Sequence, residues 1–274
     1  MSLPAAYDRP QPWLGWRVLG VVGRALRNRA SFALTVFACW LGVFREMPRR
    51  LSWRRPVRAE FFRSLRQAVG GGLATTIVAG ALVGFAMVYQ ALFFLGEAGE
   101  ERLAGSVLVA VLVREVAPVM VGLILLGRTG AATAAEIGGL HAGGQLEHLA
   151  RQGIDPFLLL VLPRTTALAL ASYTLGMIFV ATALSCGFIA GSVGGNVRMS
   201  SWEFYSILLG AMQPVDFLIF PAKMLAIGML VALTSVVTGL EGTDRESSAS
   251  RLPRTFARGT VAIMLTSIVL SLAI

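Results

Sequence analysis

Five stretches of this chain are apolar over lengths that suit a lipid bilayer better than water. They cover residues 69–95, 103–127, 165–191, 218–240 and 256–274. A helix needs about 20 apolar residues, each rising about 1.5 Å, to cross the hydrocarbon core. A charged content of only 14% and a mean hydropathy of +0.71 agree with that interpretation. The sequence therefore predicts an all-α polytopic membrane protein with five transmembrane helices.

A sixth apolar stretch, residues 31–44, is too short to cross a bilayer easily. Arginines stand on both sides of it, and four of the five tryptophans lie in or near it, at positions 13, 16, 40 and 53. Tryptophan and arginine are typical of the membrane–water interface. We therefore predict an N-terminal interfacial amphipathic helix within a basic segment, residues 1–66, followed by a membrane domain, residues 67–274.

The distribution of charge predicts the orientation. Residues 1–66 hold 13 arginines against three acidic residues, whereas the rest of the chain holds 11 basic and 12 acidic residues. The link at 96–102 is acidic and the link at 242–258 is basic. Because positive loops stay inside, we expect a cytoplasmic N-terminus, a C-terminus outside and a short outer helix within 191–214. A basic segment beside an apolar body favours anionic lipid over nucleic acid as its partner.

Charged residues inside the second stretch are candidates for function. Arg114 follows Arg102 by 12 residues, or roughly 18 Å of helix, which puts Arg114 and Glu115 near the middle of the bilayer. A central charge costs about 2.5 to 3.5 kcal/mol, and neighbours on a helix do not face each other. The pair either forms interhelical salt bridges or lines a polar substrate path. Pro118 should bend or break this helix locally.

Asp216 and Lys223 lie near the predicted outer end of the fourth stretch. Long polar side chains at such positions reach the interface, so we expect these two to anchor the helix there.

A polar segment separates the second and third stretches. Between 131 and 152 the hydrophobic run gives way to polar residues that include Glu136, Gln145 and Glu147. Leucines and isoleucine at three-residue spacing predict an amphipathic helix, which is either an ordinary loop helix or a docking element. Asp155, just before Pro156, is placed to cap the next helical piece.

The same region resembles a known family. The sequences REVAPVMVGLILLGRTGAATAAEIG and QLEHLARQGIDPFLLLVLPR, within 114–164, are similar to the signature of the MlaE/YrbE family, the permease subunits of lipid-moving ABC transporters of the MCE system. The resemblance covers roughly residues 60–274, so 67–274 is expected to be an MlaE-type permease domain. It implies a multi-pass protein of the bacterial inner membrane that moves phospholipid or another lipid to or from an MCE-protein carrier.

The resemblance also implies partners and residue roles. A homodimer would bind a cytoplasmic ABC ATPase, with room for a small accessory subunit on it, and an MCE-domain protein on the outer face. Residues 136–151 would form a coupling helix that docks in the ATPase, with Glu136, Gln145, Glu147 and Asp155 at the contact. Arg114, Glu115 and Pro118 would lie along the lipid pathway.

The residue types in the sequence favour a transport function over an enzymatic one. The chain has no GxxxxGK[ST] phosphate-binding loop, so ATP and Mg²⁺ would be bound by the partner ATPase and no cofactor is expected here. His141 and His148 are about two helical turns apart, too far for one metal ion. We therefore predict neither catalytic residues nor a metal site. The alternative is an ion-coupled secondary carrier in which Arg114 and Glu115 act as an intramembrane relay.

Overall fold

The computed structural model describes residues 14–97, 101–193, 200–241 and 248–272, and every element that it assigns within these ranges is helical. Five helices are long and apolar enough to cross a membrane, which confirms the prediction of five spans. They cover Arg55–Phe94, Gly105–Ala142, Phe157–Val193, Asp216–Leu240 and Leu252–Leu272. All five overlap the predicted stretches, and the first three, of 40, 38 and 37 residues, extend furthest beyond them.

Several spans are built from more than one helical segment. The first comprises α2 (Arg55–Val83), η2 (Gly84–Val88) and α3 (Tyr89–Glu97). The second comprises α4 (Glu101–Leu108), η3 (Val109–Val116), α5 (Ala117–Leu125), η4 (Leu126–Gly130) and α6 (Ala131–Ala142). After the short α7 (Gln145–Arg151), the third comprises η5 (Phe157–Val161) and α8 (Leu162–Val193). The helix α9 (Ser201–Ala211) precedes α10 (Asp216–Leu240) and α11 (Ser248–Leu272), the last two spans.

The segments η2 to η5 are π-helical turns, in which the backbone hydrogen bonds reach one residue further than in an α-helix. One of them, η3, ends directly before the turn that contains Pro118. Proline lacks the N–H that would bond to the carbonyl four residues earlier. A bend or break near Pro118 was predicted; the helix continues through Pro118, with the π-helical turn η3 directly before it.

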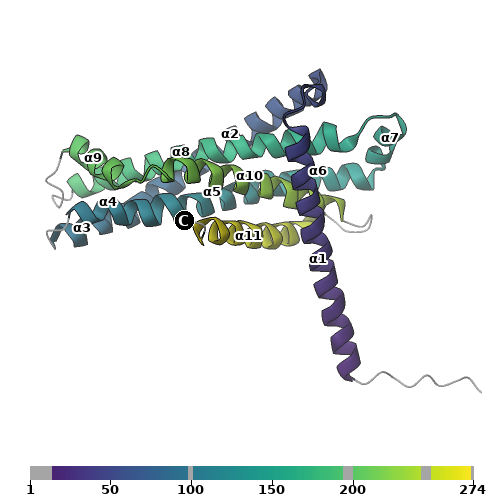
Figure 1. Cartoon of the computed structure of the whole chain (residues 1–274), viewed down its shortest axis with the longest axis horizontal. Helices are drawn as coiled ribbons and strands as arrows, with labels where there is room; N and C mark the ends of the chain where they lie inside the picture. The colour runs from purple at the N-terminus through teal and green to yellow at the C-terminus, as the bar shows by residue number, and fades with distance from the viewer. Residues whose placement is uncertain (1–13, 98–100, 194–199, 242–247, 273–274) are drawn as a thin grey trace, which may run out of the picture.

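Helices α8 and α10 form the centre of the bundle: α2 packs along α8, while α6 and α11 pack against α10 (Figure 1). Close helix packing depends on small residues. A Cβ atom on Gly84 would lie 2.0 Å from the carbonyl oxygen of Ala183, and one on Gly187 would lie 2.3 Å from Cβ of Val88. The first span can therefore touch α8 only because both positions are glycine.

The N-terminal helix is longer than its apolar stretch. Helix α1 runs from Leu14 to Glu46, and its axis lies across the bundle rather than along it (Figure 1). The arginines that bound the apolar stretch do not end the helix, because arginine is a good helix former. A 3-10 turn, η1 (Arg50–Ser52), connects α1 to α2. The crosswise orientation supports the interfacial placement, which stays a prediction.

The outer helix expected within 191–214 is α9. The links at 96–102 and 242–258, on which the orientation rests, lie partly outside the described residues. Helix α2 continues without interruption across position 66, so the division between 1–66 and 67–274 stays a prediction from composition.

Candidate functional site

Arg114 pairs with Asp216 across two spans. The Nη2 of Arg114 donates a hydrogen bond of 2.9 Å to Oδ2 of Asp216, and its Nε lies 2.8 Å from Oδ1. The backbone N–H of Gln213 also donates to Oδ2, at 2.9 Å. Asp216 is buried, whereas Arg114 is partly exposed. The guanidinium thus compensates a carboxylate that has almost no access to solvent.

Glu115 pairs with Lys223, the only lysine of the chain. The Nζ of Lys223 lies 3.1 Å from Oε1 of Glu115 and also donates to Oγ of Ser271 at 2.8 Å. Both Ser271 and Ser267 of α11 donate to the carboxylate of Glu115. The Lys223 side chain is 2% exposed and that of Glu115 is 46% exposed. The ammonium is therefore enclosed, while one side of the carboxylate is open.

The backbone carbonyl of Arg114 is the third acceptor for Lys223. The Nζ of Lys223 donates at 2.6 Å to the backbone carbonyl of Arg114. That carbonyl is four residues before Pro118, and the proline ring cannot donate to it. All three N–H donors of the ammonium are therefore satisfied. We call Arg114, Glu115, Asp216 and Lys223 the four-charge cluster.

The burial of Asp216 and Lys223 corrects one expectation. Both were expected to reach the interface as anchors, yet each is 2% exposed and each pairs with a charge on the second span. Burial of charged side chains costs desolvation free energy. The pairing of the four charges and their hydrogen bonds offset this cost. Arg114 and Glu115, the two partly exposed members, are the ones that could meet a polar ligand.

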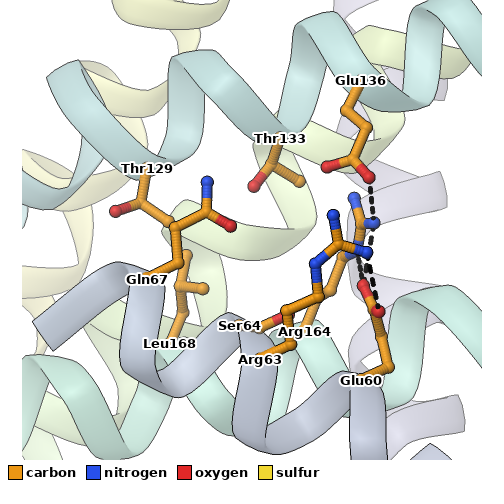
Figure 2. A pocket seen from close by; sticks show the side chains of 9 residues that line it. All are labelled: Glu60, Arg63, Ser64, Gln67, Thr129, Thr133, Glu136, Arg164 and Leu168. Carbon is orange, nitrogen blue, oxygen red and sulfur yellow. Dashed lines mark hydrogen bonds and ion pairs between the residues drawn. The ribbon is translucent and has the colours of Figure 1, made fainter. Parts of the chain in front are cut away.

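A second set of charges joins α2, α6 and α8, and Figure 2 shows it. Arg164, whose side chain is 5% exposed, donates through Nε to Oε1 of Glu60 at 3.0 Å and through Nη2 to Oε1 of Glu136 at 2.8 Å. We call these three residues the Arg164 bridge. Arg63 lies 3.8 Å from the other oxygen of Glu60 but is mostly exposed.

A small cavity adjoins the Arg164 bridge (Figure 2). Its volume is about 10 Å³, close to the space that one water molecule needs. Polar side chains dominate the remaining lining, which consists of Arg63, Ser64, Gln67, Thr129, Thr133 and Leu168. The space and the polar lining suit one ordered water, not a lipid.

The predicted helix over 131–152 is two helices in the structure. Glu136 lies on α6, which continues the second span and packs against α10, and it pairs with Arg164. Gly144 then adopts a left-handed conformation, with φ of +66°, and separates α6 from α7. Glycine accepts this conformation without steric cost. Of the residues expected at the docking contact, Glu136 is thus held separately from Gln145 and Glu147.

Helix α7 projects from one end of the bundle, opposite the end that carries α3 and α9 (Figure 1). It buries none of its residues, and Gln145 and Glu147 are exposed. A second left-handed glycine, Gly153, with φ of +76°, follows it. Asp155 Oδ1 then accepts the N–H of Phe157 at 2.9 Å, which confirms the predicted cap. Two glycine turns and a cap therefore fix an exposed polar helix at the end of the bundle.

Sequence reasoning did not select Arg164 or Glu60. Arg164 closes the sequence DPFLLLVLPR directly after an apolar run, the context in which a charge is costly and needs a partner. Glu60 is one of three acidic residues among 13 arginines, so its partner could not be read from the sequence.

Comparison with known proteins identifies a matching family and several relatives of similar sequence. The model of the family described as Permease MlaE matches residues 61–273. The chain is 28% identical over 206 residues to the Arabidopsis thaliana protein TRIGALACTOSYLDIACYLGLYCEROL 1, chloroplastic, covering 73% of this chain and 55% of that one. It is 29% identical over 136 residues to the intermembrane phospholipid transport system permease protein MlaE of Haemophilus influenzae, covering 50% and 51%.

A probable ABC transporter permease protein of Synechocystis sp. is 32% identical over 177 residues, covering 62% of this chain and 64% of that protein. The chain thus spans between about half and two thirds of the length of these curated relatives.

Proposed function

The chain belongs to the MlaE permease family, and we propose on this basis that it is the membrane-spanning subunit of an ABC transporter. In the proposal it moves phospholipid or another lipid between the bacterial inner membrane and an MCE-protein carrier. It acts as a homodimer with a cytoplasmic N-terminus, and a separate ATPase subunit, with or without a small accessory protein, binds the ATP and Mg²⁺. The chain itself is a transport subunit and not an enzyme.

One observation carries the proposal: a single span connects the four-charge cluster to the exposed helix α7. Arg114 and Glu115 lie in η3, and the same span continues through α5 and η4 to the end of α6. From Arg114 to Glu136 this is 22 residues, or roughly 33 Å of helix. Force on α7 would therefore cross the turn at Gly143 and Gly144 and then reach the buried charges along a single span.

The ATPase would act on α7. Its exposed polar side chains suit contact with a soluble partner, and the glycine turns on both sides define its position. The Arg164 bridge, which joins α6 to α2 and α8, would transmit displacement of α6 to those two helices. Such a cycle is a population shift, which nucleotide drives only through contacts that differ between the two states.

The lipid would pass the open side of the four-charge cluster. Arg114 and Glu115 are its partly exposed members, and between two copies of the chain they would face a shared space. An MCE protein would receive or deliver the lipid at the end that carries α3 and α9. The name of the Haemophilus influenzae relative, a phospholipid transport permease, supports lipid as the substrate class.

The proposal is tested by measuring whether ATP hydrolysis by a partner is coupled to lipid transport. The tagged chain, extracted in mild detergent, should co-purify with an ATPase whose hydrolysis drives lipid transfer in proteoliposomes. Gln145→Ala and Glu147→Ala on α7 should lower transport per ATP hydrolysed. Arg27→Gln is the control, because Arg27 is an exposed charge on α1, which belongs neither to α7 nor to the end that carries α3 and α9. Unchanged coupling in both α7 variants would reject the docking role.

The same preparation addresses the ion-coupled carrier. That alternative predicts transport by the chain without an ATPase, driven by an ion gradient. Each member of the four-charge cluster already pairs with an opposite charge, so a relay would have to break one of these pairs in each cycle. Gradient-driven transport by the ATPase-free protein would favour the carrier and contradict the proposal.

A further inference from the structure

A hollow lies at the elbow where the chain passes from α1 to α2. It is lined by Met47, Pro48, Trp53 and Arg58 and has a volume of about 490 Å³. That volume lies within the range of ligand-binding pockets, roughly 300 to 1,000 Å³. The hollow is separate from both charge clusters and shares no lining residue with the cavity of the Arg164 bridge.

Trp53 gives the hollow a fixed apolar wall. Its Nε1 donates to the backbone carbonyl of Met47 at 2.9 Å, and its ring packs edge-on against Phe61, with ring centroids 5.5 Å apart. The indole thereby joins the end of α1 to the first turns of α2. Arg58 is exposed at the rim. The hollow therefore combines apolar surface with an accessible guanidinium.

The elbow carries uncompensated positive charge. Glu46 already accepts hydrogen bonds from Arg49 and Ser52, and Glu60 belongs to the Arg164 bridge. Among the described residues, no carboxylate pairs with Arg58. The first turn of α2 contains no acidic residue, so the arginines there add to the positive end of the helix dipole. An anion at the elbow would lower this repulsion.

An apolar stripe leads along α1 to the hollow. Leu34, Phe37, Leu41 and Phe44 are all exposed and follow one another at three- and four-residue spacing, which places them on one face of the helix. The next apolar residue in this progression is Met47, which is exposed and lines the hollow. Acyl chains fit such a stripe, whereas a free phosphate ion would leave it uncovered.

We propose that the elbow is a binding site for an anionic phospholipid of the surrounding membrane. The headgroup phosphate binds Arg58, the glycerol backbone of the lipid lies against Met47 and Trp53, and the acyl chains follow the stripe on α1. The proposal rests on the interfacial placement of α1 and is independent of which substrate the permease moves. The bound lipid would hold α1 against the start of α2.

The experiment counts lipids on the purified full-length chain. The protein is equilibrated in detergent micelles that contain phosphatidylglycerol and phosphatidylcholine, and native mass spectrometry measures which lipid stays bound. Wild type should retain phosphatidylglycerol preferentially. Arg58→Gln should lower that retention about fivefold, the effect of removing one guanidinium at a membrane surface, and Arg58→Lys should restore most of it. Arg27→Gln, which removes an exposed arginine on α1 that does not line the hollow, is the matched control.

Three results would overturn the site. The first is equal loss in Arg27→Gln and Arg58→Gln, which would mean general attraction to a basic helix. The second is equal retention of both lipids by wild type. The third is complete displacement of the lipid by millimolar inorganic phosphate, because that would show that the apolar stripe contributes nothing. Transport measurements play no part here, so failure of this site is distinguishable from failure of the permease assignment.

Discussion

Removing either partner of the Glu115–Lys223 pair should have unequal consequences. Glu115→Ala leaves the Lys223 ammonium, which is 2% exposed, without a countercharge. Lys223→Met leaves a carboxylate that is 46% exposed and still accepts hydrogen bonds from Ser267 and Ser271. The two losses of stability should differ because only Glu115→Ala leaves an unpaired charge that is shielded from water.

The expected magnitudes follow from this geometry. An uncompensated buried charge costs about 3 to 5 kcal/mol, and Lys223 keeps two neutral acceptors, so Glu115→Ala should lower the free energy of unfolding by about 3 kcal/mol. If water reaches the open side of Glu115, Lys223→Met should cost only about 1 kcal/mol, near the value of an exposed ion pair. The double variant should cost less than the sum of the single ones.

The free energies can be measured by titrating the purified protein with sodium dodecyl sulfate and following helix loss by circular dichroism. Glu203→Ala, which removes an exposed carboxylate on α9, serves as the control and should change the free energy by less than about 0.5 kcal/mol. Equal losses in Glu115→Ala and Lys223→Met would refute the reasoning, because they would place the open side of Glu115 against acyl chains instead of a polar path.

Two further predictions concern packing and the second set of charges. Arg164→Lys should lower the free energy of unfolding by about 2 kcal/mol, because one ammonium cannot reproduce the forked contacts with Glu60 and Glu136. The control Arg63→Gln, at an exposed position, should change it by less than about 0.5 kcal/mol. A similar loss in both variants, measured in the same titration, would argue against the bridge. Gly84→Ala should lower the free energy of unfolding by about 1 to 3 kcal/mol, since its Cβ would collide with the Ala183 carbonyl. In the control Gly70→Ala, nothing lies within 4 Å of the new Cβ, so the change should be neutral or stabilising by up to about 1 kcal/mol. The reverse order would contradict the packing of the first span on α8.

The sequence predicted the spans well because their signal is local. Each apolar stretch is long enough to be recognised without knowledge of its neighbours. The sequence also predicted that Arg114 and Glu115 would not pair with each other, and the structure confirms it. The cap at Asp155 was predictable for the same reason, since its partner is two residues away.

The features that the sequence did not predict depend mainly on contacts between residues that are distant in sequence. Asp216 and Lys223 were expected to be anchors because their partners are about a hundred residues away on another span. Residues 136–151 were expected to form one helix, but Gly144 divides them, and Arg164 pairs with Glu136 on α6. Helix α1 extends beyond the apolar stretch 31–44, because an apolar run measures membrane preference, whereas arginine continues a helix in either environment. Burial and pairing of charges are properties of the assembled bundle.

The most direct test of the account is the side of the membrane on which α7 lies. A cysteine placed at the exposed Glu147, with Cys39 and Cys186 replaced by serine, can be labelled with a membrane-impermeant maleimide. The account predicts labelling in inside-out vesicles, none in intact cells treated to open the outer membrane, and protection when the ATPase is bound. Labelling from the outer side would place α7 beyond the reach of any ATPase and would contradict the proposed drive of this permease.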